Sequence, residues 1–133
     1  MWLLKTEPSA YSYDRLEGDG RTVWDGVTNP VALKNLRAMK AGDRVIVYHT
    51  GDEKAAVGIA DVVREAYPDP KQKDPKLVVV EIESVARLRR PVPLAELKAL
   101  AVFKDSPLVR QGRLSVVPLT GAQWKAIEQR GRK

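Results

Sequence analysis

Alternating apolar and polar positions predict strands along much of the chain. In residues 77–88 the apolar positions alternate with Glu81 and Glu83 before the phase shifts at Val85, which indicates a β-bulge that bends the strand. The apolar runs at residues 45–49 and 55–63 flank a short polar turn and predict a β-hairpin, in which Gly58 marks a bulge or a point of close approach. Two further strands are expected at residues 2–5 and 114–119.

Helical spacing is confined to short segments. Residues 30–40 carry apolar side chains at a loose helical spacing between Asn29-Pro30 and Gly42, which predicts a helix with clear start and stop signals. Shorter helices are expected from Ser12 and from Pro93. The run Thr120-Gly121-Ala122-Gln123 has the form of a capping box and opens a last helix with Trp124 and Ile127 facing inward.

The order of these elements favours an α+β fold. Five or six strands with hairpins and bulges indicate a mostly antiparallel sheet that curls into a small barrel, with three or four short helices beside it. The proline-rich, charged run at residues 67–76 is expected to be a surface loop. A length of 133 residues suits one domain over residues 1–133, large enough to bury a core without metals or disulfides.

Composition excludes several kinds of chemistry. The chain has no cysteine, which excludes disulfides, thiolate nucleophiles and cysteine-based metal sites, and which fits a reducing compartment such as the cytoplasm. His49 is the only histidine, and no glycine-rich phosphate loop is present. We therefore expect no metal and no cofactor. The first residues predict neither a signal peptide nor a membrane span.

The charge is unevenly distributed. Residues 1–84 hold 12 Lys and Arg against 14 Asp and Glu, a balance of −2, whereas residues 85–133 hold 11 against 3, a balance of +8. A basic region of this kind attracts polyanions and indicates a nucleic-acid partner, unless it is only a solvated basic surface. The side chains expected to contact phosphates are Arg87, Arg89, Arg90 and Arg113.

A tryptophan in a tight turn is the most informative local feature. Trp24 precedes Gly26 and the helix start at Asn29, so its ring either anchors the core or stacks on a planar ligand such as a nucleobase. Trp2 and Trp124 are expected in the core. Other polar and aromatic groups lie at strand ends and turns, where they can converge at one mouth of a barrel: Lys5, Ser9, Asp25, Tyr48 and His49.

Each of these residues also has a plain structural interpretation. Asn29 can serve only as a helix cap, Asp25 can stabilise its own turn, and Lys5 can be an ordinary edge lysine. Tyr48 and His49 are neighbours in a predicted strand, so they point to opposite faces. One of them is expected in the core and the other exposed or facing a ligand.

The chain resembles the EVE domain, found in the thymocyte nuclear protein family and in small bacterial proteins. The motifs that carry the resemblance run in order along nearly the whole chain: Trp2-Leu3-Leu4-Lys5-Thr6-Glu7-Pro8-Ser9, Trp24-Asp25-Gly26-Val27-Thr28-Asn29, Leu36-Arg37-Ala38-Met39, Tyr48-His49-Thr50, Val57-Gly58-Ile59-Ala60, Tyr67-Pro68-Asp69-Pro70 and Leu114-Ser115-Val116. The resemblance implies a PUA-like fold, related to the YTH domains that bind methylated adenine, and a pocket with aromatic walls for a flipped-out base. Residues at matching positions are the pocket candidates: Lys5, Ser9, Trp24, Asp25, Gly26, Val27, Asn29, Tyr48, His49 and Ser115.

Two functions of different class follow. The first is a non-catalytic module that binds a modified base in DNA or RNA, with Trp24 as the stacking surface and with polar groups near Asp25 to Val27, Asn29 or Ser115 reading the base edge. The second is a small enzyme that acts on a free modified nucleoside or nucleotide, with Lys5 and His49 as acid–base groups.

Overall fold

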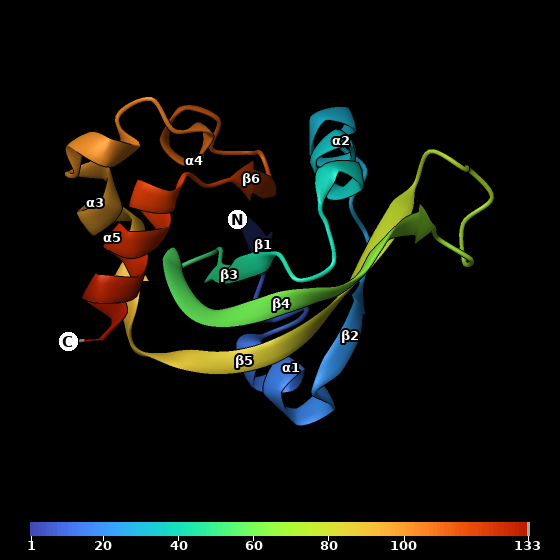
Figure 1. Cartoon of the computed structure of the whole chain (residues 1–133), viewed down its shortest axis with the longest axis horizontal. Helices are drawn as coiled ribbons and strands as arrows, with labels where there is room; N and C mark the ends of the chain where they lie inside the picture. The colour runs from blue at the N-terminus through green and yellow to red at the C-terminus, as the bar shows by residue number, and fades with distance from the viewer. Residues whose placement is uncertain (133) are drawn as a thin grey trace.

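The computed structural model describes residues 1–132, which fold around one curled six-stranded sheet (Figure 1). The strands lie in the order β2 (Arg21–Trp24), β5 (Val78–Pro93), β4 (Ala55–Pro68), β3 (Arg44–His49), β1 (Trp2–Thr6) and β6 (Val116–Pro118). Strands β1 and β3 are parallel, and the other pairs are antiparallel. The expected α+β class and curled sheet are confirmed, although in the described part no ladder joins the edge strands β2 and β6 into a closed barrel.

Short helices surround the sheet. They are α1 (Tyr13–Asp19), α2 (Pro30–Ala38), α3 (Leu94–Lys98), the 3₁₀ turn η1 (Ala101–Phe103), α4 (Pro107–Arg110) and α5 (Gly121–Gly131). Figure 1 shows α3, α4 and α5 gathered at one end of the curled sheet, with α1 and α2 beside the long strands on opposite sides. Because α2 follows β2 after a short turn, the tryptophan at the end of β2 lies close to the start of this helix.

The predicted helix starts are confirmed by their caps. The Ser12 side chain accepts a hydrogen bond from the N–H of Arg15, and the Asn29 side chain accepts from the first free N–H groups of α2. Thr120 and Gln123 form the complete capping box at α5. Trp124 is buried as expected, whereas Trp2 is only half-buried and donates its indole N–H to Asp43 at 3.0 Å.

The two long strands β4 and β5 bend the sheet. Their register shifts several times, once opposite Gly58, which confirms the expected bulge. Gly58 is also a point of close approach, because a Cβ placed there would lie 2.4 Å from the ring of the fully buried Tyr13. Both strands run beyond the predicted ends, to Pro68 and Pro93, because their twisted pairing continues past the apolar runs.

The last strand is shorter than predicted. Residues 114–119 were expected to form a strand, but β6 covers only Val116–Pro118, since it pairs with three residues of β1. The apolar side chains of the wider run, Leu114 and Leu119, are nevertheless buried. The segment just before β6 is therefore irregular but well packed, and it brings Ser115 next to β1.

Candidate functional site

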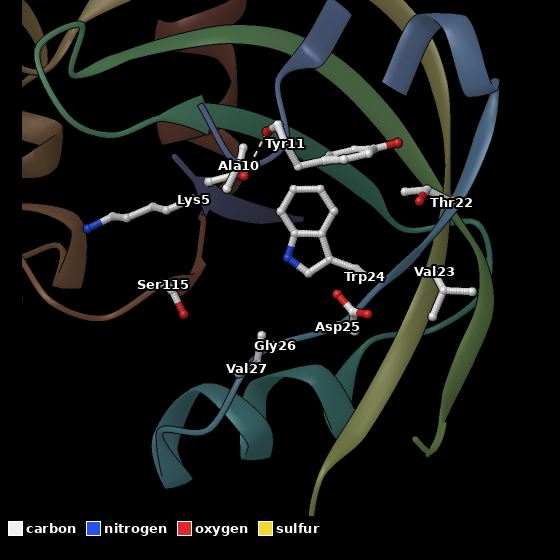
Figure 2. Close-up of a pocket in the computed structure, with 11 residues that line it drawn as sticks. Lys5, Ala10, Tyr11, Thr22, Val23, Trp24, Asp25, Gly26, Val27 and Ser115 are labelled. Atoms are coloured by element: carbon white, nitrogen blue, oxygen red, sulfur yellow. Dashed lines mark hydrogen bonds between the residues drawn. The ribbon is translucent and has the colours of Figure 1, made fainter. Parts of the chain in front are cut away.

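A cavity of about 360 Å³ lies where the ends of β1, β2 and β6 meet (Figure 2). The strands and the loops next to them contribute the lining of this cavity, and none of the lining residues belongs to a helix. The lining residues are Lys5 and Thr6 from β1, Ala10 and Tyr11 from the loop after it, Thr22, Val23 and Trp24 from β2, Asp25, Gly26 and Val27 from the turn before α2, and Ser115 before β6. A cavity of this size is within the range of small-molecule sites.

Two aromatic rings form one wall of the cavity. The rings of Trp24 and Tyr11 meet edge to face, with centroids 6.1 Å apart and planes at 89°. Tyr11 is held at both ends, since its hydroxyl donates to Asp19 at 2.7 Å and its carbonyl accepts from the Thr6 hydroxyl at 2.8 Å. The aromatic wall is therefore preformed, which lowers the entropic cost of stacking a flat ligand on it.

Trp24 serves both the core and the cavity. Its side chain is 7% exposed and belongs to the main apolar cluster, yet Figure 2 shows its indole at the centre of the cavity lining. The indole nitrogen lies on the cavity side of the ring, and none of the residues drawn accepts a hydrogen bond from it. The core interpretation of this tryptophan is confirmed, and stacking on a planar ligand stays a prediction, in which the indole N–H can donate to the ligand.

The turn after Trp24 depends on glycine. Gly26 has a φ of +78°, in the left-handed region, and no atom lies within 4 Å of a Cβ built there. Glycine is therefore needed for backbone conformation and not for space. Asn29 lies beyond the cavity lining, where its side-chain oxygen accepts from Val31 and Ala32 at 2.9 and 3.0 Å. The glycine turn and the cap together hold the Trp24 turn against α2.

Lys5 links this cavity to a second one. Figure 2 shows its side chain running away from Trp24, and its ammonium donates to the carbonyl of Gly112 at 2.9 Å and lies 5.8 Å from the Tyr48 ring. Partial burial lowers the pKa of Lys5. The backbone N–H of Lys5 donates to the carbonyl of Ser115 at 2.9 Å. This bond ties the cavity walls of β1 and the pre-β6 segment together.

Six of the ten residues expected in a base pocket line the cavity. These are Lys5, Trp24, Asp25, Gly26, Val27 and Ser115, whereas the residues elsewhere are Ser9, Asn29, Tyr48 and His49. Ser9 is exposed beside Glu7, with 3.4 Å between their side-chain oxygens. Sequence analysis missed Tyr11, which lies just before the Ser12 cap. The only signal was its place between a strand and a helix start.

Tyr48 and His49 are both buried, so the expectation of an exposed side chain was wrong, whereas the other expectation, that one of them faces a ligand, stays a prediction. The physical reason is that β3 is an interior strand covered on both faces. His49 accepts the N–H of Tyr13 at its Nε2 (3.0 Å), while its Nδ1 lies 2.7 Å from a Glu53 oxygen. Burial raises the pKa of Tyr48 to about 12.

None of the four predicted phosphate-binding arginines lines the Trp24 cavity. Arg87 forms ion pairs with Asp14 and Glu17, and Arg90 with Glu96 at 2.6 Å. Arg89 lines a different cavity, which also contains His49, and Arg113 is exposed. Within residues 1–132, Arg89 and Arg113 have no carboxylate within salt-bridge distance. Phosphate contact by these four arginines stays a prediction.

The described residues offer no metal site of the usual kind. Nowhere in residues 1–132 do three His, Asp or Glu side chains gather closely enough to hold a metal ion. No helix in the same range combines the length and apolar character needed to cross a membrane.

Comparisons with known proteins agree with the resemblance seen in the sequence. A family model described as EVE domain matches residues 1–130. Human thymocyte nuclear protein 1 is 33% identical over 95% of this chain and 71% of its own length. An NMR structure of a Rhodopseudomonas palustris protein is 42% identical, with a TM-score of 0.91 over 98% of this chain and 91% of that chain.

Two further solved structures extend this comparison. The human thymocyte nuclear protein 1 in complex with 5-methylcytosine-containing DNA has a TM-score of 0.91 at 31% identity, covering 99% of this chain and 97% of that one. An ASCH protein from Zymomonas mobilis has a TM-score of 0.59 at 11% identity, over 93% and 90% of the two chains. The ASCH match concerns the fold alone and agrees with the expected PUA-like architecture.

Proposed function

Because the chain belongs to the EVE domain family, we propose that residues 1–133 form one EVE domain that binds nucleic acid and holds a modified base in the Trp24 cavity. The observation that carries this proposal is the preformed aromatic wall of Trp24 and Tyr11. The human relative crystallised with 5-methylcytosine-containing DNA makes methylated cytosine the first base to test. Methylated RNA is the second.

The free energies involved suit a flipped base. Leaving the stack costs a few kcal/mol, and stacking on an aromatic side chain returns about 1–3 kcal/mol per base. Polar groups at the cavity, among them the Asp25 carboxylate, the Ser115 hydroxyl and the Trp24 N–H, would add hydrogen bonds to the base edge. A buried methyl group adds only about 0.8 kcal/mol, so selectivity for a mark requires a close fit around it.

Two matched substitutions test the pocket. Trp24→Phe keeps an apolar ring but removes the indole N–H and part of the stacking surface, whereas Trp124→Phe makes the same change at an equally buried site in α5 that does not line the cavity. Replacement by Ala would remove too much of the core for a clean comparison. We expect Trp24→Phe to weaken binding to a 5-methylcytosine oligonucleotide by about 5- to 30-fold, equivalent to about 1–2 kcal/mol.

The measurement is fluorescence anisotropy with labelled DNA and RNA oligomers, each with and without cytosine methylation. Trp124→Phe should bind like the parent chain. If both variants bind alike, or if no oligomer depends on Trp24, the base-pocket assignment is wrong.

We propose no catalytic residue. Of the two acid–base candidates of the alternative enzyme function, His49 lies outside the Trp24 cavity and both of its ring nitrogens face protein partners, whereas Lys5 lines the cavity but donates its ammonium to the carbonyl of Gly112. Incubation with 5-methyl-2′-deoxycytidine and its monophosphates should leave them unchanged in chromatography. A product that disappears in His49→Ala would instead support the enzyme. The cytoplasmic location stays a prediction.

A further inference from the structure

We propose that a second cavity next to the base cavity is an anion subsite, and that it holds a phosphate of the nucleotide whose base stacks on Trp24. The inference rests on the proposed function and assigns a place to the nucleic-acid backbone. This second cavity, called the lysine cavity below, has a volume of about 260 Å³ and is lined by Lys5, Tyr48, Thr50, Gly51, Lys54, Leu94, Leu108 and Gly112.

Lys5 joins the two cavities. Its side chain contributes to the lining of both, and its ammonium points away from Trp24 toward the carbonyl of Gly112. An ammonium has three donors, and Gly112 takes one of them. Gly112 in the lysine cavity and Ser115 in the base cavity lie on the same short segment before β6. In the proposed arrangement, a nucleotide with its base against Trp24 directs its sugar and phosphate toward Lys5.

The charges of the lysine cavity favour an anion. Its lining contains two lysines and no carboxylate. One carboxylate, that of Glu7, lies beside two of the lining residues: the Thr50 hydroxyl donates to it at 3.2 Å, and a Cβ built on Gly51 would lie 2.8 Å from its Oε2. Within residues 1–132, neither Lys5 nor Lys54 lies within salt-bridge distance of a carboxylate. A phosphate bound in this cavity would find two cationic side chains able to donate charge-assisted hydrogen bonds to it.

Two of the four predicted phosphate-binding arginines show the opposite arrangement. Arg87 and Arg90 already face Asp14, Glu17 and Glu96, so a phosphate would have to compete with these carboxylates, whereas Arg89 and Arg113 line neither of the two cavities. The lysine cavity offers cationic donors that no protein carboxylate holds. The lysine cavity is therefore a better place for a phosphate than the paired Arg87 and Arg90, although residues 85–133 carry the larger excess of positive charge.

Lys54 occupies a backbone position that lysine rarely takes. Its φ is +44°, and it is the one residue other than glycine with a positive φ in the described range. The left-handed conformation costs a lysine roughly 1–2 kcal/mol, a cost that is absent in glycine because glycine has no Cβ. The conformation is held by a hydrogen bond from the N–H of Leu94 to the Lys54 carbonyl at 2.8 Å. A side chain kept at such a position is consistent with use of its ammonium group in the cavity.

The salt dependence of DNA binding tests the subsite. Each phosphate contact contributes about 0.9 to the slope of log K against log salt on duplex DNA. Lys54→Gln should therefore lower the slope by about 0.9 and weaken binding of a 5-methylcytosine duplex by about eightfold at 0.1 M salt. Lys54→Arg should keep the slope, and Lys125→Gln, which removes an exposed lysine on α5 away from both cavities, should match the parent chain.

A second measurement separates a backbone contact near the base from a distant one. Titration calorimetry with 5-methyl-2′-deoxycytidine and its 5′- and 3′-monophosphates should show severalfold tighter binding of one monophosphate than of the nucleoside. Lys54→Gln should abolish that difference. If Lys54→Gln and Lys125→Gln have the same slope and affinity while Trp24→Phe weakens binding, the subsite is wrong and the proposed function stands. If no oligomer depends on Trp24, the proposed function fails and the subsite fails with it.

Discussion

Gly58→Ala is a substitution by a single methyl group that should destabilise the fold severely. The added Cβ would lie 2.4 Å from the Cε2 and Cζ atoms of Tyr13, whereas carbon atoms in contact lie about 3.5–4.0 Å apart. The Tyr13 ring would have to move by about 1 Å or more. It is fully buried, and its hydroxyl donates to the carbonyl of Ile59 at 2.6 Å.

The magnitude is the sum of two effects. Overpacking of a filled core costs about 1–3 kcal/mol, and loss of the buried hydrogen bond to Ile59 leaves polar groups unpaired at a further cost of about 1–3 kcal/mol. The expected loss is therefore about 2–6 kcal/mol, compared with a total stability of about 5–15 kcal/mol for a domain. Gly58 does not have a positive φ, so backbone strain adds nothing.

Urea unfolding followed by circular dichroism measures this loss, and a double-mutant cycle assigns it to Tyr13. In a Tyr13→Ala background the ring is absent, so Gly58→Ala should change the free energy of unfolding by less than about 0.5 kcal/mol. An equal loss in both backgrounds would refute the steric explanation. If the parent background cannot tolerate Gly58→Ala at all, the variant should fold once Tyr13→Ala is added.

Three further predictions concern stability. The pKa of Tyr48 is raised from 10 to about 12, so the unfolded chain loses this proton at a lower pH than the folded chain does. The free energy of unfolding, measured with urea, should therefore fall by up to about 3 kcal/mol between pH 10 and 12, and it should fall by less over the same interval in Tyr48→Phe. Asn29→Ala should cost about 1 kcal/mol in the same assay because two N–H groups of α2 lose their acceptor, and Asn29→Asp should restore most of it. His49→Ala should cost at least about 1–3 kcal/mol because the buried N–H of Tyr13 loses its partner, and hydrogen exchange of that amide should be faster.

Features encoded by neighbouring residues could be predicted from the sequence. The helix starts at Ser12, Asn29 and Thr120 were predicted correctly, because each is marked by a side chain that accepts from an N–H two or three residues away. The turn from Trp24 to Val27 was identified as a site candidate for the same reason, since all its residues are contiguous.

Features that depend on distant residues could not be predicted. The carboxylates that hold Arg87 come from α1, about 70 positions earlier, so a local charge count interpreted that arginine as available. Tyr11 approaches Trp24 only because the loop after β1 packs beside β2. No local pattern reports such an approach, and the burial of both Tyr48 and His49 likewise depends on the layers that cover β3.

The position of β1 has a consequence for how the chain folds during synthesis. Residues 2–6 pair on one side with residues 45–49 of β3, and residues 2–4 pair on the other with residues 116–118 of β6. One edge of β1 stays unpaired until residues 116–118 have left the ribosome, more than 100 positions later. Pairings of such long sequence separation slow folding and expose apolar strand edges meanwhile. Lys5 and Ser115 flank this junction, so the cavity walls should assemble only after translation of β6.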